Sequence, residues 1–143
     1  MRRFARLLLG LLMVAVVVNV AAPALAGSPH FIKTTLSATV SSDGSTLYVS
    51  GKEAGLGDEP QVHIVVTATA ECINGGGNHP RAVNKATFSD EDDFPVQNGK
   101  AEFEFTLTAV FQPSCSPPMT VRWSDVTVED TTNGVGPVSI RIG

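Results

Sequence analysis

Residues 100–111 have the sequence KAEFEFTLTAVF, in which apolar and polar side chains alternate almost without a break. Successive side chains of a β-strand point to opposite faces of the sheet, so a period of two predicts a strand with one buried face. The segment therefore predicts a long strand that packs against a core on one side only. The apolar positions of that side are Ala101, Phe103, Phe105, Leu107, Ala109 and Phe111.

Three further segments show the same alternation and predict further strands with one buried face. Residues 138–142 also alternate, and residues 82–88 form the weakest candidate strand. No segment after residue 26 has the period of a long amphipathic helix. The inward positions of the three segments are Val62, Ile64, Val66, Ala68, Ala70 and Cys72; Ile32, Leu36, Ala38 and Val40; and Leu47 and Val49.

Turn residues separate these segments at a spacing typical of a two-sheet sandwich. Glycine adopts positive φ without steric cost, and tight hairpin turns need that conformation. Between Trp123 and Val126 the inward phase slips by one residue, which predicts a β-bulge at Ser124 and Asp125. The three turn pairs are Asp43-Gly44, Asn98-Gly99 and Asn133-Gly134.

The predicted fold is all-β: an immunoglobulin-like antiparallel two-sheet sandwich with six or seven strands and one disulfide, formed by residues 27–143 as a single domain. Cys72 and Cys115 are the only cysteines, and an even number in an exported domain predicts a disulfide. Because Cys72 ends an inward face and Cys115 follows Pro113, the bond should join a strand end to a loop.

Residues 1–26 have the three parts of a secretory signal peptide. Arg2, Arg3 and Arg6 form the basic start, residues 7–20 are mostly apolar, and residues 24–26 (Ala-Leu-Ala) form a small-x-small cleavage site. The apolar part is shorter than the roughly 20 residues that span a bilayer. We therefore expect a secreted, extracellular protein with no membrane anchor after signal removal.

The chain that follows this leader is acidic. Seven Lys and Arg residues and fourteen Asp and Glu residues lie after Ala26, which gives a formal net charge of −7. The cations form no cluster, whereas a nucleic acid or an anionic membrane surface requires clustered cations to neutralise its phosphates. Neither is an expected partner.

Patterns that indicate catalysis or metal binding are sparse. His30, His63 and His79 lack the spacing of zinc sites, and His30 would be the fourth residue after cleavage rather than the first, as secreted copper oxygenases require. No G-x-S-x-G motif is present. Residues 90–93 (DEDD) lack the ligand spacing of a calcium loop and are expected to form a solvated acidic turn. We expect no catalytic residue, metal or cofactor, although paired carboxylates that meet only in space leave no sequence pattern.

Two segments differ from ordinary strand sequence and form the candidate binding surface. Residues 52–57 (KEAGLG) follow a predicted strand, and residues 72–80 (CINGGGNHP) contain three consecutive glycines, which are entropically costly to order. The alternative is a tight loop that only closes the sandwich. The candidate binding residues are Lys52, Glu53, Asn74, Asn78 and His79.

Several of these segments carry a resemblance. The chain resembles small secreted proteins of actinomycetes and fungi in four segments: residues 29–31 (PHF), the KEAGLG block, the C-x-N-G-G-G-x-x-P segment and Asn84-Lys85. Those proteins also have a later C-P-P segment. It corresponds to residues 115–118 here, where Ser116 departs from the pattern. This resemblance implies secretion and a sandwich fold, and it assigns no function. Residues 130–140, with the pattern D-x-T-x-G-x-G-P-V-S-I, are similar to the corresponding segment of the antitumour chromoprotein apoproteins, which carry a hydrophobic chromophore. Those proteins have two disulfides between cysteines close in sequence, whereas the two cysteines of this chain are far apart.

The expected function is that of a secreted, non-catalytic binding or structural module of the extracellular space or cell envelope. Its partner would be an unknown extracellular macromolecule or small ligand. One alternative is a carrier of a small apolar ligand, and a second is a small secreted hydrolase or metal-dependent enzyme. The inward phase of Trp123 argues against an exposed aromatic platform for sugars.

Overall fold

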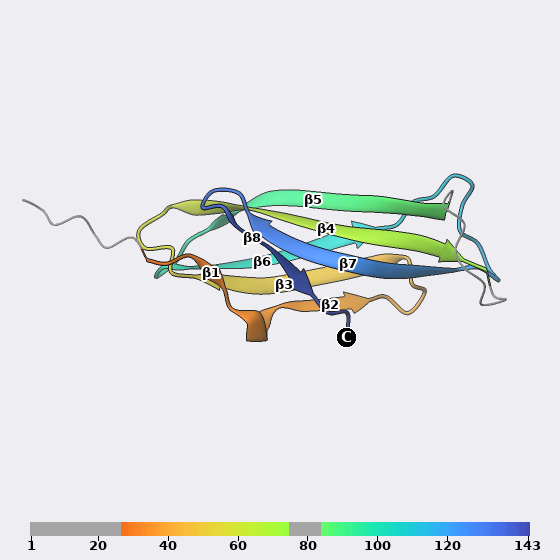
Figure 1. The fold of residues 1–143 in the computed structure, drawn as a ribbon, viewed down its shortest axis with the longest axis horizontal. Coiled ribbons are helices and arrows are strands. Elements are labelled where there is room, and N and C mark those ends of the chain that lie inside the picture. The colour runs from red at the N-terminus through yellow and green to blue at the C-terminus, as the bar shows by residue number, and fades with distance from the viewer. Residues whose placement is uncertain (1–26, 75–83) are drawn as a thin grey trace, which may run out of the picture.

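A computed structural model describes residues 27–74 and 84–143 as two antiparallel sheets packed face to face (Figure 1). A short 3-10 helix, η1 (Lys33–Thr35), separates the first two strands, and no helix of the described residues has the length and hydropathy to cross a membrane. The eight strands are β1 (His30–Phe31), β2 (Ser37–Val40), β3 (Thr46–Ala54), β4 (Gln61–Ile73), β5 (Lys85–Pro95), β6 (Lys100–Thr108), β7 (Thr120–Asp130) and β8 (Val135–Ile140).

One sheet is built around β3, which pairs with β6 along its whole length on one side and with β1 and then β2 on the other. The second sheet has the order β5-β4-β7-β8. The chain passes from one sheet to the other after β3, after β5 and after β6. These crossings make the two sheets one interlocked sandwich.

The alternation of apolar residues explains the core between the sheets. Every second residue of β4 is buried, from Val62 to Cys72, and the same holds for β6 from Ala101 to Leu107. The predicted inward faces of these two strands are confirmed, although β6 ends at Thr108 and Phe111 is buried beyond it.

Turn geometry also follows the sequence. Asn98 (φ 52°) and Gly99 (φ 71°) both have positive φ, and Gln97 and Lys100 exchange backbone hydrogen bonds of 2.8 and 3.1 Å around them. Two central residues with positive φ define the type I′ hairpin turn that Asn-Gly favours. The turn between β5 of one sheet and β6 of the other is therefore encoded by two residues.

The predicted bulge in β7 is confirmed, but it lies at Asp125 and Val126, one residue further along than expected. Thr67 pairs with Thr127 and Thr69 with Ser124, so two residues of β7 lie opposite the single residue Ala68. Asp125, one of these two, has φ of 51°. The bulge keeps Trp123 on the inward side, where it is 5% exposed.

The predicted disulfide is confirmed. Cys72 lies next to the end of β4 and Cys115 lies in the loop between β6 and β7, with their Cα atoms 5.7 Å apart. The bond therefore joins a strand end to a loop, as the sequence indicates.

The predicted strand over residues 32–40 is wrong in its first half, where η1 separates β2 from the short strand β1. With β1, the described residues form eight strands rather than the expected six or seven. Thr35 Oγ1 donates to the Ile32 carbonyl (2.8 Å) and accepts from the Lys52 amide (3.0 Å). The Thr35 hydroxyl thus takes the place of a backbone carbonyl as the acceptor for β3. The predicted strand is therefore interrupted at η1. Ile32 and Leu36 are consequently only half-buried.

The acidic turn expected at residues 90–93 is also wrong, because these residues lie in the middle of β5. The weak strand expected at residues 82–88 begins at Lys85 and continues to Pro95, while residues 82 and 83 are outside the described residues. Pairing of β5 with β4 over its full length gives the acidic segment its extended conformation.

Candidate functional site

The described parts of the two candidate binding segments, residues 52–57 and 72–74, lie at opposite ends of the sandwich. Residues 52–57 adjoin the Asn98-Gly99 turn, where the Leu56 amide donates to the Gly99 carbonyl at 3.0 Å. Asn74 is exposed beyond the far end of β4, two residues after the disulfide-bonded Cys72. The described residues of the two segments therefore form no common surface. Asn78 and His79 lie outside the described residues.

Lys52 lies on the outer face of the β3–β6 sheet. Its ammonium pairs with the carboxylate of Glu102, the residue directly opposite it on β6. Both side chains line a shallow hollow of about 350 Å³, a size at the lower end of small-molecule sites. The lining combines two aromatic rings with polar groups: Thr35, Ser50, Gly51, Lys52, Phe94, Glu102, Phe103 and Glu104.

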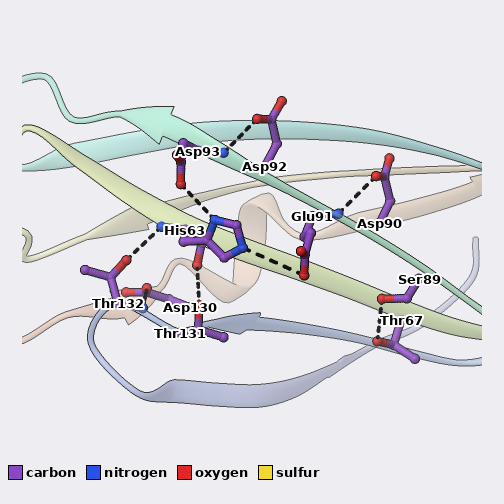
Figure 2. Close-up of polar contacts among 10 residues, drawn as sticks. All are labelled: His63, Thr67, Ser89, Asp90, Glu91, Asp92, Asp93, Asp130, Thr131 and Thr132. Carbon is purple, nitrogen blue, oxygen red and sulfur yellow. Dashed lines mark hydrogen bonds and ion pairs between the residues drawn. The ribbon is translucent and has the colours of Figure 1, made fainter.

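A second polar site, which we call the His63 site, lies on the outer face of the β5-β4-β7-β8 sheet and consists of His63, Glu91 and Asp93 (Figure 2). The strand register places Asp93 directly opposite His63, with its Oδ1 2.7 Å from the ring Nδ1. Glu91 lies two residues along β5, with its Oε2 3.8 Å from Nε2. The ring is thus held between two carboxylates.

The backbone of His63 is held by the turn between β7 and β8. Its amide donates to Thr132 Oγ1 at 2.8 Å, and its carbonyl accepts from the Thr131 amide at 3.0 Å. These bonds join His63 on β4 to the turn between β7 and β8 (Figure 2). The backbone of His63 is therefore hydrogen-bonded to this turn as well as paired within the sheet.

The electrostatics of the His63 site favour the protonated ring. The hydrogen bond to Asp93 raises the pKa of His63 above its ordinary value, and the negative charges of Asp93 and Glu91 raise it further. All three side chains are at least one-third exposed, which screens these interactions. The site therefore gains positive charge on its ring as the pH falls, while its rim remains acidic.

Two more carboxylates extend the acidic surface along β5. Asp90 and Asp92 occupy the same phase as Phe88 and Phe94, which pack against the core, yet both are exposed because β5 is an edge strand. Each accepts a hydrogen bond from the next backbone amide, at 3.0 and 2.8 Å. Among the described residues, no Lys or Arg forms an ion pair with any of the four carboxylates of residues 90–93.

Glu53 departs most from the sequence interpretation. It is 0% exposed, so its side chain is not part of an exposed binding surface in the folded protein. The phase of β3 explains why: Leu47 and Val49 are inward, and continuing in steps of two leads to Glu53. That continuation is the signal that could have identified it.

Glu53 shares its buried environment with Asp130 at the end of β7. Asp130 is also 0% exposed and accepts three hydrogen bonds: from the Thr132 amide (2.7 Å), the Asn133 amide (3.2 Å) and Asn133 Nδ2 (2.8 Å). Asn133 Nδ2 also donates to Glu59 at 3.0 Å. Neither oxygen of Glu53 receives such a donor. Burial raises the pKa of Glu53 to about 8, and the Asp130 and Glu59 carboxylates contribute to the shift.

Over residues 27–74 and 84–143, no three His, Cys, Asp or Glu side chains are placed to hold a metal ion. His30 lies in the other sheet from His63, and its Nδ1 is 2.7 Å from the Ser28 carbonyl oxygen.

No protein-family model matches this chain, and no curated protein or solved structure matches it either.

Proposed function

We propose that the protein is a secreted, non-catalytic binding module of the extracellular space or cell envelope, and that its sandwich is immunoglobulin-like. The sheet composition supports the second part: β1, β2, β3 and β6 form one sheet and β5, β4, β7 and β8 the other, with crossings after β3, β5 and β6. Sandwiches of that type alternate between sheets in this way. The disulfide is consistent with an oxidising compartment.

The observation that supports a binding role most is the His63 site with the acidic strand beside it. Four consecutive carboxylates stand on a regular strand, and His63 is their one ion-pair partner among the described residues. A fixed array of like charges attracts a partner of opposite charge and steers its approach. We therefore propose a partner that presents amines or guanidinium groups.

A hydrolase is the weaker alternative for this site. A catalytic histidine requires a nucleophile within hydrogen-bond reach. In the described part of the chain, both ring nitrogens of His63 are directed to carboxylates. His63 and Asp93 therefore resemble the His–Asp part of a catalytic triad, and among the described residues no hydroxyl group is hydrogen-bonded to the ring.

The test of the binding proposal is the double substitution Glu91→Gln/Asp93→Asn. Binding to an immobilised cationic peptide and to envelope fractions should weaken roughly tenfold at low salt, because two exposed charge pairs are lost. Surface plasmon resonance at low and high salt measures this change.

The matched control is Glu102→Gln/Glu104→Gln, which removes the same charge from the outer face of the opposite sheet. Equal weakening by both double variants would mean that net charge, not the His63 site, determines binding. No binding by the unmodified protein would reject the proposal altogether.

A carrier of a small ligand is the second candidate, and the hollow beside Lys52 favours it. Phe94 and Phe103 offer apolar contact there, and Lys52 and Glu102 offer polar contact. Native mass spectrometry of the protein purified from its own host should then show a bound small molecule. Detection of the bare polypeptide alone would argue against a carrier.

A further inference from the structure

Glu53 and Asp130 come from opposite sheets, and the Asp130 carboxylate acts on the buried carboxyl group of Glu53 across the sandwich. Glu53 belongs to β3, and Asp130 ends β7. Both side chains are 0% exposed, although two ionised carboxylates buried together would repel each other without solvent screening. The pair therefore needs a proton or another cation to be stable.

The hydrogen bonds distinguish the two carboxyl groups. Asp130 accepts three N–H donors, and such bonds stabilise the ionised form. Glu53 accepts none, so its ionised form has no compensation. A protonated Glu53 can donate its O–H to Asp130, and this bond satisfies both groups. The proton accordingly resides on Glu53.

We propose that one proton, held by Glu53 and shared with Asp130, joins the two sheets at the end of the sandwich opposite the disulfide. Asp130 pairs with Ile64 of β4, and Cys72 lies eight residues further along the same strand. A covalent bond thus fastens one end of the sandwich, and a proton-dependent hydrogen bond fastens the other.

The surroundings of Glu53 favour the neutral carboxyl group. β1 and β6 present Phe31 and Ala101 beside it in the sheet, and neither supplies a charge. From the segment before β4, Glu59 adds a second negative charge, and it is already bound to Asn133. No Lys, Arg or His forms an ion pair with Glu53 among the described residues. Loss of the proton would therefore leave three carboxylates facing one another.

The sign of the pH effect follows from the raised pKa. In the unfolded chain Glu53 loses its proton near its ordinary pKa of 4.5, whereas in the folded protein it keeps the proton to about pH 8. Between these values the unfolded state binds fewer protons, so the folding stability falls as the pH rises. Above pH 8 the hydrogen bond that links the sheets is lost.

The direct test is a carbon-13 NMR titration of the Glu53 side-chain carboxyl carbon in the unmodified protein. Its resonance should shift with a midpoint near pH 8. A midpoint near 4.5 would overturn the proposal. This measurement needs no variant, so it stands even if substitutions at Glu53 prevent folding.

The second test uses Glu53→Gln, whose amide can donate to Asp130 at every pH. Between pH 5 and 8, the melting temperature of the unmodified protein should fall relative to that of the variant. Titration of His63 also contributes, but it is common to both proteins and cancels in the difference. Glu104→Gln, which removes an exposed carboxylate, should follow the unmodified protein. Parallel curves for the unmodified protein and Glu53→Gln would contradict the proposal.

Discussion

Replacing Cys72 and Cys115 with alanine is expected to lower the free energy of unfolding by about 4 kcal/mol. The two residues are 43 positions apart, and their bond restricts the unfolded chain by closing a loop of that length. Domains of this size have total stabilities of about 5–15 kcal/mol, so the loss is a large fraction of the whole. Urea unfolding followed by circular dichroism measures it.

Reduction provides the matched control for this prediction. A reductant should lower the free energy of unfolding of the unmodified protein by a similar amount. It should leave the free energy of unfolding of the alanine variant unchanged. If the free energy of unfolding of the double variant fell by less than about 1 kcal/mol, the disulfide would not be the main restriction on the unfolded chain, and the prediction would be wrong.

Trp123→Ala should be the most destabilising single substitution in the core and should lower the free energy of unfolding by about 3–5 kcal/mol. The indole is 5% exposed and packs edge-on against Phe88, with ring centroids 5.6 Å apart. Its Nε1 donates to the Gly44 carbonyl at 2.9 Å. Truncation leaves a cavity between the sheets and deprives that carbonyl of its donor.

Trp123→Phe separates these two contributions. Phenylalanine keeps most of the apolar contact but lacks the indole N–H, so the decrease in the free energy of unfolding should be only about 1–2 kcal/mol. Equal losses for Ala and Phe would show that the hydrogen bond to Gly44, rather than packing, stabilises this part of the core. Urea midpoints of the two variants decide between these outcomes.

The sequence predicts most of the sandwich because its signals are local. The period of two in residues 62–72 and 100–111 corresponds to β4 and β6. The type I′ turn at Asn98-Gly99 and the bulge at Asp125 follow from the conformations these residues favour. In each case the preference of a few neighbouring residues agrees with the fold.

The acidic strand was not predictable in the same way. β5 is an edge strand, so Asp90 and Asp92 remain exposed at inward-phase positions and the alternation disappears from the sequence. Its extended conformation depends on pairing with β4, and that register is a tertiary property. The contact of His63 with Asp93 therefore depends on a partner strand that sequence alone does not identify.

The candidate site could be predicted only in part. The outward position of His63 follows from the phase of β4. The burial of Glu53 and Asp130 also follows from phase, since Val126 and Val128 lead in steps of two to Asp130. That the two carboxyl groups meet requires the packing of two sheets, which no local pattern encodes.

The acidic edge of β5 also affects how the protein behaves at high concentration. The free side of an edge strand presents unpaired backbone groups that can template sheet extension by another molecule, and natural proteins resist this with charges on the edge, including inward-pointing ones. Residues 90–93 place four like charges there, two at inward-phase positions. Two copies that approached through this edge would repel each other at neutral pH, so fibril growth from it is suppressed until acid neutralises the carboxylates.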